Sequence, residues 1–310
     1  MRYGVLCAIL YNYERYAVFE RLKVMWVSSY WKDYELLDCS GGEKLERWGS
    51  YVLRRPDPQA IWQTPKDAGW DRADAVYRRS ETGGGRWTRS DVPDSWQIRN
   101  GNLTFNVKLM NFKHTGIFPE QAANWDFIDR TIRNAGRPVN VLNLFAYTGA
   151  ASLAAAAAGA SVCHVDAAKG MVAWAKENAA ASGLSQKPIR WIVDDCRKFV
   201  EKEIRRGKKY DAIIMDPPSY GRGPTGEVWK LEDSLWDFLE LCTGVLSEKP
   251  LFVLISSYTT GLSPSVLTYL SETVFSTRYG GKSDSQELGL PVTKSGLILP
   301  CGASCRWLGE

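Results

Sequence analysis

The chain has 310 residues and a formal net charge of +4 at neutral pH, with 45% hydrophobic and 24% charged residues, the composition of a globular protein with room for one large domain and a smaller one. Seven cysteines without a C-x-x-C pair and only two histidines argue against a zinc site and a disulfide framework, so we expect no metal and a reducing, cytoplasmic location. No apolar run reaches membrane-spanning length, which excludes a helical membrane protein, and the slight positive charge is compatible with RNA without proving it.

The first third of the chain predicts an extension followed by a small β-rich domain. Residues 1–33 are rich in tyrosine and tryptophan and contain a candidate helix at 13–24, and we assign them no function. Residues 34–112 alternate short apolar runs with turn residues, as a small β domain does. The expected strands lie at 34–37, 51–54, 75–79 and 87–89, followed by a hairpin over 96–109 that turns at Asn100-Gly101.

Tryptophan and arginine are concentrated in this β region. Seven of the thirteen tryptophans precede residue 100, and arginines such as Arg54, Arg78 and Arg86 are interleaved with them. Aromatic rings stack on bases and arginines hold phosphates, so the region suits RNA binding. The alternative is structural: the tryptophans form the core of the domain and the arginines its solvated rim.

From residue 113 onward, long apolar runs alternate with helical segments, which places a domain boundary there. We expect helices at 121–135, 151–158, 169–182, 197–206, 233–246 and 264–275, and strands at 141–145, 161–165, 189–193, 212–215 and 251–255. The last two strands, 287–292 and 297–307, form an antiparallel hairpin. Residues 113–310 therefore predict a doubly wound α/β domain with a seven-stranded, mostly parallel sheet, whose closing hairpin a dehydrogenase Rossmann domain lacks.

The stretch VLNLFAYTGAASLAAAAAGASVCHVD, residues 141–166, carries the clearest functional pattern. It contains a strand, a tight turn, an alanine-rich helix, a second strand and an acid, which is the first half of a nucleotide-binding βαβ unit. Asp166 follows the glycine turn at a spacing near the roughly twenty residues at which an acid binds both hydroxyls of a ribose. The alternative is an ordinary strand and helix with no ligand.

The turn in this unit indicates which nucleotide is bound. A dinucleotide pyrophosphate needs several glycines so that backbone N–H groups approach the phosphates, whereas this loop has only Gly149 beside the large side chains of Asn143, Phe145 and Tyr147. S-adenosylmethionine contains adenosine without phosphate, and its sulfonium favours carboxylates and aromatic faces. The loop therefore favours S-adenosylmethionine over a nicotinamide dinucleotide.

A second loop follows the third strand at the same sheet edge, where open α/β sheets bind ligands. Here Asp195 could accept a hydrogen bond from the adenine amine, and Cys196 could offer its backbone N–H. Alternatively, Asp194 or Asp195 caps the helix that begins at Arg197.

The fourth strand ends in DPPSYG, residues 216–221. Asp216 followed by Pro217 and Pro218 gives a rigid loop, because both prolines restrict the backbone. A carboxylate and a proline carbonyl that accept both hydrogens of an exocyclic amine would turn the nitrogen lone pair toward a methyl donor, and Tyr220 is the candidate ring to stack on the flipped base. The alternative is a rigid turn with a core tyrosine.

The motifs FKHTGIFPEQ, NLFAYTGAASL, VDAAKGMVAWAKEN and IMDPPSYGRG, in this order, resemble those of class I S-adenosylmethionine-dependent methyltransferases of the ribosomal RNA large-subunit group, over roughly residues 111–307. That group includes cytosine-5 and guanine-N7 methylating enzymes. The resemblance also implies that the small β region helps to bind RNA. It implies cofactor contacts at Phe118, Gln121, Asn143, Phe145, Tyr147, Thr148, Gly149, Asp166, Asp195 and Asp216, with Ala167 and Cys196 beside two of these acids.

Two departures from that group bear on the acceptor. Cytosine-5 methylation needs a cysteine thiolate that attacks the ring, and related enzymes carry it just after the fifth strand, where this chain has Ser256 and Ser257. The spare candidate, Cys301, lies in the last strand, and Ser219 separates the prolines from the aromatic ring. The sequence therefore favours methylation of a base nitrogen in RNA, with ribosomal RNA as the expected partner.

Three alternatives remain open. The acceptor of the methyl group is a protein or a small molecule, or the chain is a non-catalytic RNA-binding protein on the same scaffold, although an inactive scaffold has no need of the loop at 216–221. The third alternative, a nicotinamide oxidoreductase, is disfavoured by the missing triple-glycine loop.

Overall fold

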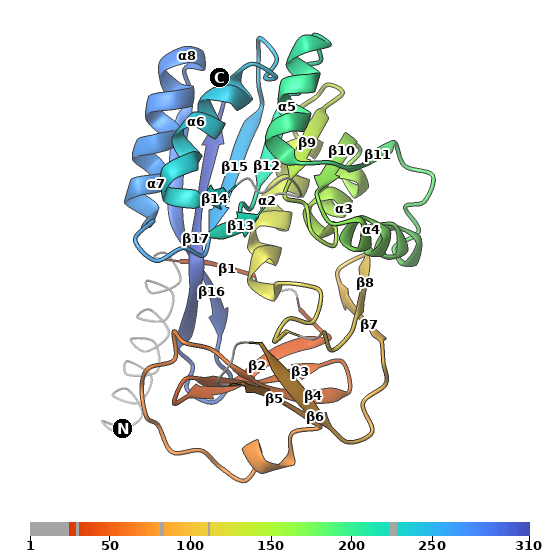
Figure 1. The fold of residues 1–310 in the computed structure, drawn as a ribbon, viewed down its shortest axis with the longest axis vertical. Coiled ribbons are helices and arrows are strands. Elements are labelled where there is room, and N and C mark those ends of the chain that lie inside the picture. The colour runs from red at the N-terminus through yellow and green to blue at the C-terminus, as the bar shows by residue number, and fades with distance from the viewer. Residues whose placement is uncertain (1–24, 29–30, 81–83, 111, 223–227) are drawn as a thin grey trace, which may run out of the picture.

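The computed structural model describes residues 25–28, 31–80, 84–110, 112–222 and 228–310. The candidate helix at 13–24 lies outside the described residues. Figure 1 shows a large sheet flanked by helices, with a smaller sheet beneath it. Within the described residues, no helix has both the length and the apolar surface that crossing a bilayer requires.

The large sheet has eight strands in the order β1-β16-β17-β15-β12-β9-β10-β11. Its parallel strands pair side by side, and β17 is antiparallel to both β15 and β16. The strands are β9 (Asn140–Leu144), β10 (Ser161–Asp166), β11 (Ile189–Val193), β12 (Ala212–Met215), β15 (Phe252–Ser257), β16 (Lys282–Pro291) and β17 (Ile298–Leu308). The doubly wound, mostly parallel sheet with a closing hairpin is thus confirmed.

The eighth strand, β1 (Met25–Val27), is the one that the sequence did not predict. It pairs in parallel with the outer edge of β16. A three-residue edge strand is too short to show a period, so no pattern marked it. Its Trp26 ring lies 3.5 Å from the guanidinium of Arg306 on β17, which makes a cation–π contact.

Helices cover both faces of this sheet. On one face, α2 and α3 pack around Ile128 and Leu153; on the other, α5, α6 and α7 pack around Phe199, Phe238 and Leu267. The helices are α2 (Ala122–Arg133), α3 (Ala150–Ala157), α4 (Lys169–Ala181), α5 (Cys196–Arg205), α6 (Leu231–Thr243) and α7 (Pro264–Ser271). The last continues through a π-helical turn, Glu272–Ser276, into α8 (Thr277–Tyr279). These bounds agree with the expected helices to within a few residues.

The smaller sheet contains five strands in chain order, β2-β3-β4-β5-β6. They are β2 (Tyr34–Ser40), β3 (Glu43–Trp48), β4 (Tyr51–Pro56), β5 (Ala75–Arg79) and β6 (Gly85–Arg89), and a separate hairpin follows, β7 (Trp96–Asn100) with β8 (Leu103–Val107). The predicted hairpin with its turn after Asn100 is confirmed. Trp48 and Trp70 are almost completely buried, so these two tryptophans belong to the core.

Strand β3 was missed because four of its six residues, EKLERW, are charged. The charges find partners on neighbouring strands: Glu43 with Arg54 at 2.7 Å, and Glu46 with Arg55 at 2.5 Å. Cross-strand ion pairs of this kind stabilise a sheet without any apolar alternation. They cannot be recognised until the register is known.

Contacts with the larger domain fix both the smaller sheet and the separate β7–β8 hairpin. The tip of the β16–β17 hairpin donates from the backbone N–H of Thr293 to the carbonyl of Leu36, and the Lys294 ammonium lies 2.8 Å from the Asp38 carboxylate. The β7–β8 hairpin lies against α4, where Asn106 N–H donates to Asn178 Oδ1 at 2.8 Å. These contacts place the smaller sheet beside the carboxyl ends of the large sheet's strands.

Candidate active site

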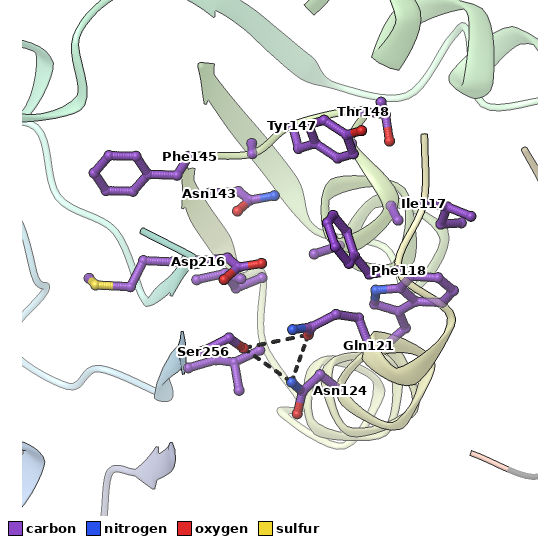
Figure 2. A pocket seen from close by; sticks show the side chains of 18 residues that line it. Ile117, Phe118, Gln121, Asn124, Asn143, Phe145, Tyr147, Thr148, Asp216 and Ser256 are labelled. Carbon is purple, nitrogen blue, oxygen red and sulfur yellow. Dashed lines mark hydrogen bonds between the residues drawn. The ribbon is translucent and has the colours of Figure 1, made fainter. Parts of the chain in front are cut away.

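A cavity of about 670 Å³ lies between the two sheets, a volume typical of small-ligand sites. One wall contains Asp166, Asp195 and Asp216, which lie at the carboxyl ends of β10, β11 and β12, and the opposite wall contains Lys44 and Arg55 of the smaller sheet. A second cavity of about 60 Å³ adjoins it (Figure 2). The two cavities share the lining residues Ile117, Phe118, Phe145, Tyr147 and Asp216.

The loop after β9 has an unusual backbone. Phe145 and Tyr147 have φ of 54° and 49°, a left-handed conformation that costs non-glycine residues energy and is common at binding sites. Each is held by a side chain from another loop at this edge of the sheet, Tyr147 by the end of β10 and Phe145 by the start of α5. The N–H of Tyr147 donates to Asp166 Oδ2 at 2.8 Å, and the N–H of Phe145 donates to Cys196 Sγ at 3.2 Å.

The hydrogen bonds of this turn also argue against a phosphate-binding site. The N–H of Gly149, the third N–H in the turn, donates to the Ala146 carbonyl at 3.0 Å. A Cβ on Gly149 would lie 2.8 Å from that of Ala175, so the glycine is needed for close packing of the turn against α4. The N–H groups of Phe145, Tyr147 and Gly149 are thus engaged inside the protein, whereas a pyrophosphate site needs them free.

Asp166, the candidate ribose ligand, is held by two backbone N–H groups. Its Oδ2 accepts from Tyr147 N–H and its Oδ1 accepts from Ala168 N–H at 2.8 Å. Burial raises the pKa of this carboxyl, and the two backbone hydrogen bonds oppose that shift. Each oxygen retains a second lone pair, and both Asp166 and Ala167 line the larger cavity, so the carboxylate has an acceptor for each ribose hydroxyl.

Asp195 caps helix α5, as one of the alternatives predicted. Its Oδ1 accepts from Lys198 N–H at 2.9 Å, while Asp194 makes a salt bridge of 2.6 Å with Lys202. The cap uses one oxygen of Asp195, and the residue still lines the cavity together with Cys196. Capping and an adenine contact are therefore compatible.

The lining of the smaller cavity includes amide and hydroxyl side chains, and Figure 2 shows three of them, Gln121, Asn124 and Ser256, joined by hydrogen bonds. Asn143 donates to Ser152 Oγ at 2.8 Å, and Asn124 Nδ2 donates to Gln121 Oε1 at 2.8 Å. The buried guanidinium of Arg306 donates to Asn124 Oδ1 at 2.8 Å, which fixes the orientation of that amide. Such groups match the ammonium and carboxylate of a methionine moiety.

Thr148 and Gly116 join this turn to the segment before α2. The Thr148 hydroxyl donates to the Gly116 carbonyl. Gly116 has φ of +101°, and a Cβ there would lie 2.3 Å from the Trp174 ring on α4. The segment 113–120, which carries Phe118 into both cavities, therefore depends on this glycine for its position.

We expect Gly116→Ala to lower the free energy of unfolding by about 3 kcal/mol, because backbone strain adds to a clash, and to weaken cofactor binding. Gly136→Ala is the matched control: its φ is +64° with no atom within 4 Å of the new Cβ, so it costs only strain, about 1 kcal/mol. Thermal unfolding with and without S-adenosylhomocysteine measures both effects. Equal destabilisation by the two variants would contradict the packing argument.

The Asp-Pro-Pro loop follows β12. Burial and the neighbouring Glu120 raise the pKa of Asp216 to about 7, and among the described residues no group donates a hydrogen bond to its carboxylate. The loop is held from outside: Trp229 Nε1 donates to the Pro218 carbonyl at 2.7 Å, and Leu231 N–H donates to the Ser219 carbonyl at 3.1 Å.

Pro217 and Pro218 line the larger cavity beside Asp216, but Tyr220 does not. Its side chain is 50% exposed on the short strand β13 (Tyr220–Arg222), which pairs with β14 (Val228–Lys230). The structure thus brings together every proposed site residue in one or the other cavity except Tyr220.

The aromatic rings beside the loop are instead Trp229 and Tyr258, neither of which the sequence singled out. The Trp229 ring centroid lies 5.4 Å from that of Phe145, and Tyr258 accepts a hydrogen bond from Gln121 Nε2 at 2.9 Å. Tyr258 directly follows β15, so the rule that ligands bind at the carboxyl ends of strands could have found it. Trp229 had no such signal, because it reaches the loop only through the β13–β14 pairing.

The two cavities fit S-adenosylmethionine. Acceptors for a ribose diol, amides for a methionine moiety, and the aromatic rings of Phe118 and Tyr147 with the Asp216 carboxylate for a sulfonium all line the same connected space. The occupied N–H groups of the turn do not fit a dinucleotide. The donor set therefore matches the cofactor expected from the sequence.

Comparisons with known proteins agree with this chemistry. A family model described as S-adenosylmethionine-dependent methyltransferase matches residues 67–233, more than half of the chain. The crystal structure of a SAM-dependent methyltransferase from Agrobacterium tumefaciens is 39% identical, with a TM-score of 0.87 over 93% of this chain and 94% of that one. A methyltransferase complexed with SAH has a TM-score of 0.68 at 22% identity, over 90% of this chain and 76% of that one, and supports the fold.

Among curated proteins, the ribosomal RNA large subunit methyltransferase K/L of Shewanella frigidimarina is 35% identical over 134 residues, 43% of this chain and 17% of that protein. The protein of the same name from Pseudoalteromonas atlantica is 35% identical over 142 residues, 46% of this chain and 18% of that protein. The match thus spans less than a fifth of these relatives' length. The chain belongs to the S-adenosylmethionine-dependent methyltransferases, and S-adenosylmethionine is its cofactor.

Proposed function

We propose that this methyltransferase modifies a base nitrogen in RNA, and that the RNA is ribosomal. The observation that carries the proposal is the Asp216 carboxylate, which lines the cavity without a hydrogen-bond donor among the described residues and is followed by two prolines. The curated relatives that act on ribosomal RNA support the choice of acceptor. The bound cofactor supplies an electrophilic methyl group.

The loop has two acceptors for an exocyclic amine. The Pro218 carbonyl already accepts from Trp229, whereas the Pro217 carbonyl accepts from no donor in the described part of the chain. Asp216 and the Pro217 carbonyl would each take one amine hydrogen, which turns the nitrogen lone pair toward the methyl group. Asp216 in its ionised form then receives the proton that the nitrogen loses after methyl transfer.

The residues outside the loop have distinct roles in this proposal. Asp166 and Ala167 bind the ribose of the cofactor, and Asp195 and Cys196 its adenine. Phe118, Phe145 and Tyr147 enclose the sulfonium region. Gln121, Asn143, Thr148 and Gly149 line the smaller cavity that would take the methionine moiety.

We further propose that residues 34–112 form an acceptor-binding domain and residues 113–310 the catalytic domain. The smaller sheet supports this division, because it contributes Lys44 and Arg55 to the cavity wall opposite Asp216. A cytoplasmic location agrees with both the acceptor and the chemistry, since the six cysteines of the described residues are free thiols.

Cytosine-5 methylation is not supported. Cys301 lines the cavity, but burial and the nearby Glu120 raise the pKa of its thiol well above the usual range, so the nucleophilic thiolate is scarce. We therefore expect Cys301→Ala to retain methyl transfer within about threefold. Transfer of the tritium-labelled methyl group from the cofactor measures this activity. A Cys301→Ala protein that folds but has no activity would favour the cytosine-5 mechanism again.

The acceptor can be identified by mass-spectrometric mapping of modified nucleosides in ribosomal RNA from cells with and without the gene. We expect the loss of one base methylated on nitrogen, and its restoration by the purified protein in vitro. If no nucleoside changes, a protein or small-molecule acceptor becomes the leading candidate. Binding to RNA without any methyl transfer would instead favour a non-catalytic RNA-binding role.

A further inference from the structure

The cavity wall opposite Asp216 is unusually rich in cations. Lys44 on β3 and Arg55 on β4 are direct cross-strand partners, and Lys113 follows from the segment before α2. All three line the 670 Å³ cavity. Like charges placed directly opposite each other destabilise a sheet, so this arrangement needs compensation or a function.

Two carboxylates compensate Lys44 and Arg55. Glu46 lies 2.5 Å from Arg55 Nε and 3.4 Å from Lys44 Nζ, and Asp57 lies 3.2 Å from Lys44 Nζ. These pairs are buried or nearly so, and their charges cancel within the wall. The carboxylates are thus already engaged by two of the three cations.

Lys113 is left without such a partner. Within the described residues it makes no salt bridge, and its ammonium donates one hydrogen bond, to the Pro56 carbonyl at 3.4 Å. Burial and the positive charges of Lys44, Arg55 and Arg79 lower the pKa of Lys113, which Asp57 only partly offsets. A half-buried ammonium among cations is costly unless an anion joins it.

The residue next to Lys113 completes the surroundings of such an anion. His114 also lines the cavity, and burial together with Arg55 lowers its pKa to about 4. The imidazole is therefore neutral at pH 7 and offers one N–H donor without adding charge. Lys113 supplies the charge and His114 a hydrogen bond, and the His114 ring centroid lies 5.3 Å from that of Phe118.

We propose that Lys113 and His114 form an anion subsite that binds a phosphate of the acceptor, next to the base that enters toward Asp216. The inference deepens the proposed function and rests on RNA as the acceptor, since each nucleotide of RNA carries a phosphate. The subsite gives the smaller sheet a defined purpose: Lys44 and Arg55 engage Glu46 and Asp57, so these carboxylates do not neutralise Lys113, which makes the contact. Phosphate contacts of this kind position a nucleic acid without reading its sequence.

The test compares Lys113→Gln with Lys108→Gln in methyl transfer to an unmodified transcript of large-subunit ribosomal RNA. Lys108 lies on the same segment but contacts the Trp174 ring at 4.1 Å, outside the cavity lining. We expect Lys113→Gln to raise the KM for RNA about tenfold. The slope of the logarithm of RNA affinity against the logarithm of salt concentration should become shallower by about one. Cofactor affinity should stay unchanged, and Lys108→Gln should match the wild type throughout. An unchanged KM and salt slope in Lys113→Gln would overturn the subsite and leave RNA methylation standing.

A second measurement keeps the subsite testable if the wild type methylates no RNA, in which case the proposed function fails. Inorganic phosphate is then titrated by calorimetry into protein saturated with S-adenosylhomocysteine. Binding to the wild type and to Lys113→Arg, but not to Lys113→Gln, supports the subsite on its own. Equal binding to the wild type and Lys113→Gln overturns it.

Discussion

Asp216→Asn is expected to lower kcat for methyl transfer by about a thousandfold or more while cofactor affinity changes by less than about fivefold. The substitution keeps the shape of the side chain but removes the charge that would orient the acceptor nitrogen and take its proton. The chain offers Asp237→Asn as a control, because Asp237 is an exposed carboxylate on α6. Single-turnover transfer from labelled cofactor, together with calorimetric binding of S-adenosylhomocysteine, separates the two effects. Full turnover by Asp216→Asn would show that this loop is not the reaction centre.

The role of Asp216 as proton acceptor also predicts how kcat/KM depends on pH. Because burial and Glu120 raise the pKa of Asp216 to about 7 and the reaction needs the ionised form, kcat/KM should rise about tenfold per pH unit below that value and level off above it. Glu120 and Tyr258 also face this region, and burial raises the pKa of each. The residual activity of Asp216→Asn should not show this rise of kcat/KM with pH. A flat wild-type profile between pH 6 and 8 would contradict the assignment.

Asp166→Ala is expected to weaken binding of S-adenosylmethionine about a hundredfold or more, since hydrogen bonds to a charged group contribute about 1.5–3 kcal/mol each. The variant loses the acceptors for the ribose and also the bond that holds Tyr147 in its left-handed conformation. Calorimetric titration of S-adenosylhomocysteine measures the change. Asp194→Ala is the neighbouring control, since Asp194 pairs with Lys202. If Asp166→Ala binds S-adenosylhomocysteine as tightly as Asp194→Ala does, Asp166 is not the ribose ligand.

Much of the catalytic domain could be predicted because its signals are local. The strands β9, β10, β11, β12 and β15 are short, mostly apolar runs, and the candidate residue at the end of each follows from its position in the sequence alone. The meeting of Asp166, Asp195 and Asp216 in one cavity then follows from parallel strands sharing an edge. The hydrogen bond by which Asp166 also holds Tyr147 could not be predicted, because it depends on the dihedral angles of the turn.

The acceptor side was harder to predict. Strand β3 is mostly charged, and its pairing partners become visible only with the register of β2 and β4. Tyr220 was chosen because it follows the prolines, yet the β13–β14 pairing turns the chain so that Trp229 lines the cavity instead. In the sequence, Lys113 only marked the predicted domain boundary. Its position near Lys44 and Arg55 results from the tertiary fold.

The small edge strand β1 has a consequence for how the protein can be engineered. Trp26 packs on the Arg306 guanidinium, which in turn orients Asn124 beside Gln121. Trimming the chain to residues 113–310, a common step in preparing crystals or minimal enzymes, would therefore remove a support of the smaller cavity. Shortened versions that still fold should be judged by how tightly they hold the methyl donor, before any loss of acceptor recognition is considered.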